Sequence, residues 1–152
     1  MITKPAYTYS ADITHIYDGD NVKCNIDLYD RQWKIGETIR LYGIDAHEIK
    51  RSKTHNRDSA HVKIGYDQRD ALLKFLGLDP NNFRRVAKYQ KIETPIRVII
   101  QTLQDESGKF GRLLGILHKN GINVNEQMRD VIGGVNFFDD KTYTKDYPIK
   151  IN

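Results

Sequence analysis

The stretch that decides the fold is "IYDGDNVKCNIDL", residues 16–28, which places a tight turn between two strands. Asp18-Gly19 is among the strongest short signals for a hairpin turn. After the turn, apolar and polar residues alternate as far as Leu28, which is typical of a half-buried strand. Residues 7–17 are rich in aromatic and β-branched side chains, as strands are. The two strands are therefore predicted to pair, although such a turn does not require the second aspartate, Asp20.

The next segment predicts a third strand between two polar stretches. Residues 29–37 have the composition of a turn, and residues 38–44, "TIRLYGI", that of a strand. Arg40 lies between two apolar residues, so its guanidinium is expected on the opposite face of this strand. Residues 46–57 are polar and basic and are expected to form a loop.

The rest of the chain predicts two helices and two more strands. Apolar residues recur with helical spacing from about 58 to 76, and Gly77 follows. Residues 79–94 show no regular pattern. The two further strands and the second helix, which has Asn123 as its candidate N-cap, are expected at 95–103, 112–118 and 123–132.

This order of elements indicates a mainly β protein with helices, of the α+β class. Five short strands around one small core, with a helix between strands three and four and a helix after strand five, fit a five-stranded OB-fold barrel. The sequence shows no internal repeat and no linker, so residues 1–152 are expected to form a single domain. Residues 135–152 lack periodicity and are expected to form an extended tail.

Composition limits the classes of function. The 152 residues can bury a core without disulfides, and the single cysteine, Cys24, excludes an internal disulfide framework. The N-terminal residues show no signal sequence and no segment approaches 18 apolar residues, so we expect a cytoplasmic protein that does not enter a membrane, with a secreted form less favoured. The net charge of +4, from 24 basic and 20 acidic residues, suits a phosphate-bearing partner but equally a well-solvated surface.

Six charged residues lie where turns and strands do not require charge. They are Asp18, Asp20, Arg40, Asp45, Glu48 and Arg112. Each alone has an ordinary structural explanation, but together they have complementary chemistry. Hard divalent cations prefer carboxylate oxygens, and arginines can hold a phosphate through forked hydrogen bonds. With a further carboxylate to orient or deprotonate a water, the set predicts metal-assisted phosphodiester hydrolysis.

Four blocks of sequence carry a resemblance to a known family. They are "IYDGDNV" (16–22), "IRLYGIDAHE" (39–48), "GKFGRLLGIL" (108–117) and "INVNEQM" (122–128). In order and spacing they resemble the thermonuclease (staphylococcal nuclease-like) family across roughly residues 9–134, and above all its small, signal-less members from phages and mobile elements. The resemblance implies an OB-fold enzyme that hydrolyses DNA and RNA with calcium and leaves 3′-phosphate ends.

The resemblance also implies a set of metal ligands. Asp20 and Asp45 match the carboxylates that bind calcium in the family. Ala46 matches a position that binds calcium through its backbone carbonyl. Carboxylate chemistry alone would accommodate Mg²⁺ as well as Ca²⁺, so the choice of calcium depends on the resemblance.

The remaining matched positions concern the substrate. Glu48 matches the carboxylate proposed as general base, and Arg40 and Arg112 match the arginines that hold the scissile phosphate and stabilise the transition state. Lys109 and Phe110 fall where the family contacts the phosphate and sugar of the nucleotide. These residues predict an active endonuclease whose partner is DNA, RNA or both, with a monomer as the default state.

Several positions depart from the family pattern. Ala46 and His47 replace the usual Thr-Pro, and losing the proline is expected to loosen the loop that aims the general base. Asn21 replaces a common threonine. Phe110 replaces a common tyrosine, which removes a hydroxyl contact. The region after Gly134 lacks the third helix of the best-known members.

Two other functions remain open. One is a non-catalytic OB-fold module that binds single-stranded nucleic acid through a basic groove and aromatic side chains. The basic residues 50–57, the stretch "KYQKIETPIR" (88–97) and the nine tyrosines would serve it. The other is a calcium-bound scaffold for protein contacts, which would leave the two arginines without a common partner. A zinc site at His47, His55 and His61 is disfavoured, because their spacing fits no usual zinc pattern.

Overall fold

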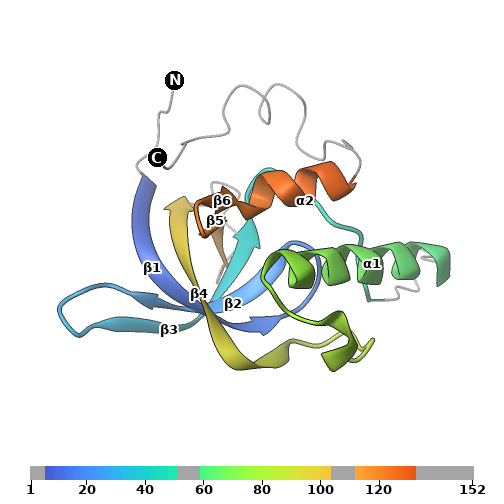
Figure 1. Cartoon of the computed structure of the whole chain (residues 1–152), viewed down its shortest axis with the longest axis horizontal. Coiled ribbons are helices and arrows are strands. Elements are labelled where there is room, and N and C mark those ends of the chain that lie inside the picture. The colour runs from blue at the N-terminus through green and yellow to red at the C-terminus, as the bar shows by residue number, and fades with distance from the viewer. Residues whose placement is uncertain (1–5, 51–58, 104–111, 133–152) are drawn as a thin grey trace.

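The computed structural model describes residues 6–50, 59–103 and 112–132. Within them the protein is α+β, with six strands in one sheet and two α-helices (Figure 1). The elements are β1 (Ala6–Ile16), β2 (Asn21–Asp27), β3 (Trp33–Leu41), α1 (Ser59–Phe75), a 3₁₀ helix (Pro80–Asn82), β4 (Gln90–Leu103), β5 (Arg112–Lys119), β6 (Ile122–Asn123) and α2 (Val124–Ile132). The predicted tail, 135–152, lies outside the described residues.

The strands follow the order β3-β2-β1-β4-β5-β6, and all of these neighbours are antiparallel. In addition, β3 pairs in parallel with β5, with Arg40 opposite Leu114. The prediction of five strands is wrong. Residues Asn120 and Gly121 turn the chain with φ angles of 52° and 78°, and this turn brings the two-residue strand β6 back against the end of β5.

Two strands extend further than predicted. β3 begins at Trp33, in a stretch predicted to be a turn, and its first four residues are exposed, so burial imposes no alternating pattern on them. β4 begins at Gln90 rather than at 95, because Gln90 and Lys91 pair with the end of β1. The predicted positions of both helices are confirmed. Asn123 caps α2 as predicted, since its Oδ1 accepts a 3.0 Å hydrogen bond from the backbone N–H of Glu126.

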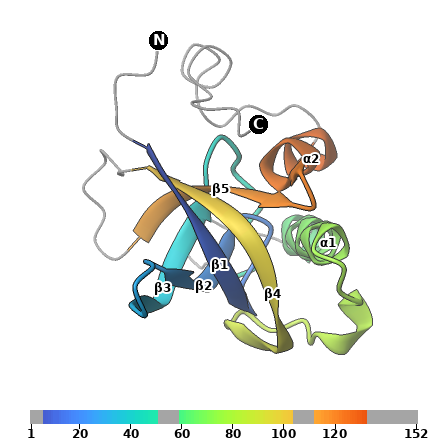
Figure 2. The same ribbon diagram turned by 60° about the vertical axis from the view of Figure 1, so that its left-hand side comes forward.

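The core lies between the sheet and the helices, which pack side by side on one side of the molecule (Figures 1 and 2). Several elements contribute large apolar side chains without exposed surface. Among them are Ile13 and Ile16 of β1, Ile39 and Leu41 of β3, Leu72 and Leu73 of α1, Leu76 directly after α1, Ile100 of β4, and Ile116 and Leu117 of β5. Cys24 of β2 is also fully buried, and burial raises the pKa of its thiol to about 12. Neither helix described is long and apolar enough to cross a membrane.

One buried amide fixes the end of β3 relative to β5. Asn125, at the start of α2, donates through Nδ2 to the carbonyl oxygens of Tyr42 and Gly115, at 2.9 Å each. Its Oδ1 accepts a 3.0 Å hydrogen bond from the backbone N–H of Leu117. A buried amide with all these partners satisfied holds the three segments in one arrangement. The segment that follows β3 is therefore held in place on the side of α2.

Candidate functional site

The turn between β1 and β2 is braced by its first aspartate. The backbone N–H of Tyr17 donates to the carbonyl of Asn21 at 3.1 Å and closes the turn. Asp18 Oδ1 accepts hydrogen bonds from the backbone N–H of Asp20 at 3.1 Å and from Nδ2 of Asn21 at 3.0 Å. Asp18 is thus committed to the turn, which agrees with the prediction that Asp18-Gly19 makes the bend.

Asp20 is connected to the segment that follows β3. Its Oδ1 accepts a 2.7 Å hydrogen bond from Nδ2 of Asn21, and its Oδ2 accepts a 3.1 Å hydrogen bond from the backbone N–H of Ala46. Its own carbonyl oxygen accepts a 2.8 Å bond from the N–H of Leu41. Asp20 is only 2% exposed, so its side chain joins the turn to the residues after β3 and does not face solvent.

Arg40 connects the two predicted metal carboxylates. Its guanidinium lies on the face of β3 opposite its buried neighbours, as predicted, and one nitrogen lies 3.0 Å from Oδ1 of Asp45. The same nitrogen lies 3.6 Å from Oδ2 of Asp20. The turn after β1 and the chain after β3, 25 residues apart in sequence, therefore meet at one point.

The environment of Asp20 opposes its negative charge. Burial raises the pKa of Asp20 well above its ordinary value of 3.8, and the charge of Asp18 and its hydrogen bond raise it further. The Arg40 guanidinium and the N–H of Ala46 act in the other direction without cancelling the effect. Additional positive charge at this point would favour the ionised carboxylate.

A divalent cation suits the donor set in part. Asp20 and Asp45 offer carboxylate oxygens around one position that the Arg40 guanidinium, itself a cation, can reach. In the described part of the chain, no group of three or more His, Cys, Asp or Glu side chains is arranged to hold a metal ion. The remaining ligands would have to be waters or backbone oxygens, which calcium accepts. The contact shown by Ala46 uses its N–H, so its carbonyl as a ligand stays a prediction.

Helix α1 holds the loop that carries the acidic residues. The backbone N–H of His47 donates to Oε1 of Gln68 at 2.7 Å. A Cβ on Gly65 would lie 2.8 Å from the carbonyl oxygens of His47 and Glu48, and a Cβ on Gly19 would lie 2.8 Å from Cβ of Ala46. Both glycines therefore allow backbones to approach more closely than any other residue permits.

The hydrogen bond of His47 also bears on the missing proline. A proline at position 47 has no N–H and could not donate to Gln68. Here that hydrogen bond and the packing against α1 both hold the loop, while the expected loosening stays a prediction. The ring of His47 also stacks on that of His61 of α1, with centroids 5.8 Å apart.

The other predicted residues are placed less completely. Glu48 is exposed and follows directly on the fixed part of the loop. Arg112 begins β5 and pairs in register with Thr38, while its side chain is not among those described. Lys109, Phe110 and the basic residues 51–57 lie outside the described residues. Sequence reasoning missed Gln68 and Gly65. A glycine inside a helical pattern was the one available signal.

Comparison with known proteins assigns neither a family nor a function to this chain. The chain matches no model of a known protein family, and a search of curated proteins finds no match. What the site can do is therefore argued from its own side chains: two carboxylates that share a guanidinium, a braced turn and a loop clamped to a helix.

Proposed function

We propose that this protein is a calcium-dependent nuclease that hydrolyses phosphodiester bonds of DNA, RNA or both and leaves 3′-phosphate ends. The observation that carries the proposal is the position of the Arg40 guanidinium, within 4 Å of the carboxylates of both Asp20 and Asp45. Two acids and a strong phosphate ligand at one point suit a cation together with a phosphate. We further propose that the sheet is an OB-type barrel, which the pairing of β3 with β5 supports.

Binding of the metal and of the phosphate would be divided among residues of the turn and of β3. Asp20 and Asp45 would hold the cation, with the carbonyl of Ala46 as a further ligand. When bound, Ca²⁺ supplies positive charge that stabilises charge developing on the phosphate. The guanidinium of Arg40, which pairs with Asp45 here, would then donate to the phosphate oxygens.

The chemical step would depend on residues on either side of that centre. Glu48 would orient a water and take its proton as the water attacks phosphorus. The bond from phosphorus to the 5′ oxygen opposite the water would break, and that oxygen would take a proton from solvent. Arg112 would donate to the charge that builds on the equatorial oxygens, where one preorganised donor is worth about 3–4 kcal/mol. Lys109 and Phe110 would contact the neighbouring phosphate and sugar. This division gives each predicted residue a distinct test.

The decisive experiment is a degradation assay on labelled single- and double-stranded DNA and RNA with Ca²⁺, with Mg²⁺ and with a chelator. We expect degradation with Ca²⁺, its loss on chelation and its recovery when Ca²⁺ is added back. Glu48→Gln should lower the rate by at least ~100-fold, because it removes the proton acceptor and keeps the shape. The matched control Glu93→Gln, at an exposed position of β4, should leave the rate unchanged.

Two outcomes would contradict the proposal. Binding of single strands without degradation under any metal condition would favour the non-catalytic nucleic-acid-binding module. Calcium binding without nucleic-acid affinity would favour the scaffold. Equal rates for wild type and Glu48→Gln would remove Glu48 from the mechanism even if the protein degrades DNA.

A further inference from the structure

A second charged feature lies between α1 and the first residues of β4. Residues 84–91 read "RRVAKYQK" and contain four cationic side chains and no acid; we call them the basic loop. Arg84, Lys88 and Lys91 of this loop are exposed. An exposed basic segment often has no fixed structure, so the question is whether this one has a defined shape.

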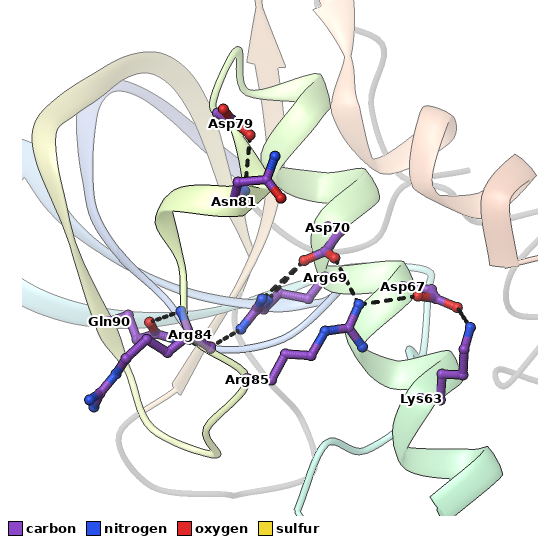
Figure 3. Close-up of polar contacts among 9 residues, drawn as sticks. All are labelled: Lys63, Asp67, Arg69, Asp70, Asp79, Asn81, Arg84, Arg85 and Gln90. Atoms are coloured by element: carbon purple, nitrogen blue, oxygen red, sulfur yellow. Dashed lines mark hydrogen bonds and ion pairs between the residues drawn. The ribbon is translucent and has the colours of Figure 1, made fainter.

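The backbone of the basic loop is fixed at Arg84. The side chain of Gln90 closes the loop, since its Oε1 accepts from the N–H of Arg84 at 2.8 Å and its Nε2 donates to the carbonyl of Arg84 at 2.7 Å. Arg69 of α1, which is 1% exposed, donates to the same carbonyl at 2.7 Å (Figure 3). A buried guanidinium thus anchors the loop to the helix.

Two acids of α1 that face the loop, Asp67 and Asp70, are already paired. Asp70 accepts from Arg69 at 3.0 Å and lies 3.4 Å from Arg85, while Asp67 lies 3.0 Å from Lys63 and 3.6 Å from Arg85 (Figure 3). Arg85 also lies 5.3 Å from the ring of Tyr66, so it is turned toward α1. Of the four cations of the loop, Arg85 is therefore the one that the helix neutralises.

The other three cations keep their charge available. Within the described residues, Arg84, Lys88 and Lys91 form no salt bridge. The side chain of Arg84 points away from α1, although its backbone is held by Arg69 (Figure 3). The result is a fixed backbone with exposed cations.

Neighbouring strands extend this positive surface. The ring of Tyr89 lies 4.9 Å from that of Tyr17, and the ammonium of Lys23 lies 4.6 Å from the Tyr89 ring. His15 pairs with Lys23 on one side and with Lys91 on the other, and burial followed by these two lysines lowers the pKa of His15. The surface thus runs from the basic loop to the residue that precedes the Asp18–Asp20 turn.

We propose that the basic loop and Lys23 bind the sugar-phosphate backbone of a nucleic-acid strand, beyond the phosphate that is cleaved. Spaced cations on an anchored backbone need little ordering on binding, and each phosphate contact releases condensed counterions. The inference rests on the proposed function for the identity of the polyanion, but it requires only binding and not hydrolysis.

The test is the salt dependence of binding without metal. A fluorescein-labelled single-stranded DNA oligonucleotide is titrated with protein in chelator, and the anisotropy is followed over a series of salt concentrations. The variant Lys88→Ala/Lys91→Ala should bind at least about fivefold more weakly at low salt, and the slope of log affinity against log salt should fall in magnitude by about 1.4. The control Lys34→Ala/Lys74→Ala removes the same charge, from the β2–β3 hairpin and from α1, and should bind within about twofold of wild type.

The outcomes separate this inference from the nuclease proposal. Equal weakening by both double variants would show a general charge effect and overturn the surface. Degradation activity with wild-type binding by Lys88→Ala/Lys91→Ala would also overturn it and leave the nuclease intact. If no form of the protein degrades nucleic acid but the salt slope of binding falls as predicted for Lys88→Ala/Lys91→Ala, the binding surface is supported and the nuclease proposal is not. Binding to phosphatidylserine vesicles but not to the oligonucleotide would make the partner a membrane and refute the proposal.

Discussion

The acidic site and the basic loop lie on segments that flank the same helix, and α1 holds them in opposite ways. At the acidic site, Gly19 and Gly65 allow close packing around the loop after β3, and burial of Asp20 raises its pKa. At the basic loop, Arg69 and Gln90 hold only the backbone and leave the cations in solvent. A buried carboxylate favours a tightly bound cation, whereas exposed cations exchange counterions for phosphates.

This difference predicts that the acidic site and the basic loop respond differently to substitutions. The acidic site should fail when packing changes, because a Cβ has no room between the helix and the loop. The basic loop should tolerate changes of shape and respond to changes of charge or anchoring. Three substitutions test this contrast, and we give them in order of expected size.

The largest effect is expected from Gly65→Ala. Alanine is worth up to about 1 kcal/mol more than glycine inside a helix. The new Cβ would, however, lie 2.8 Å from the carbonyl oxygens of His47 and Glu48, which have little freedom to move. We expect a net loss of about 1–3 kcal/mol in the free energy of unfolding, measured with urea. The control Lys63→Ala, at an exposed position of the same helix, should change the free energy of unfolding by less than about 0.5 kcal/mol. If Gly65→Ala is more stable than the wild type, the loop moves away from the new Cβ and the prediction is wrong.

A smaller effect is expected from Asp20→Asn, and it should depend on pH. In the unfolded chain Asp20 ionises near 3.8, whereas in the metal-free folded protein it keeps its proton to a higher pH. Between these two pKa values the unfolded state binds fewer protons than the folded state. The contribution of Asp20 to the free energy of unfolding is therefore full below about pH 4, and it is lost as the pH rises through the pKa of Asp20 in the folded protein. Asp20→Asn should remove this part of the slope of unfolding free energy against pH.

Two comparisons complete that test. Asp30→Asn, in the exposed β2–β3 turn, should keep the wild-type slope. Calcium should stabilise the wild type at neutral pH, because a ligand of the folded state adds its binding free energy, and it should stabilise Asp20→Asn much less. If wild type and Asp20→Asn show equal pH slopes, Asp20 has the same pKa in the folded and in the unfolded protein, which would contradict the prediction.

Local patterns in the sequence predicted most of the secondary structure. Alternation predicted β2 and the outward guanidinium of Arg40, helical spacing predicted α1, and Asn123 was correctly identified as a cap. The exposed start of β3 and the two-residue strand β6 were missed, because neither has a buried face that imposes a pattern. Local signals end where an element has no preferred face.

The fixing of both charged segments could not be predicted, since it depends on contacts between distant residues. Gln68 and Arg69 are polar residues in an amphipathic helix, where the sequence alone indicates a solvated face, yet both are buried. Their partners, His47 and the carbonyl of Arg84, are 21 and 15 residues away. The chemistry of the acidic site was visible in the residue types, but the means by which it is held was not.

The smallest effect is expected from Gln90→Ala, which tests whether the anchoring of the basic loop matters. The variant loses two hydrogen bonds to Arg84 and no charge, so we expect a loss of up to about 1 kcal/mol in the free energy of unfolding. Affinity for the single-stranded oligonucleotide should fall by about two- to threefold with an unchanged salt slope, because the cations remain but must be ordered on binding. Gln32→Ala, in the β2–β3 turn, should bind as wild type does. If Gln90→Ala binds the oligonucleotide with wild-type affinity, the charges of the loop act without a fixed backbone. The basic loop and the acidic site would then differ in charge alone.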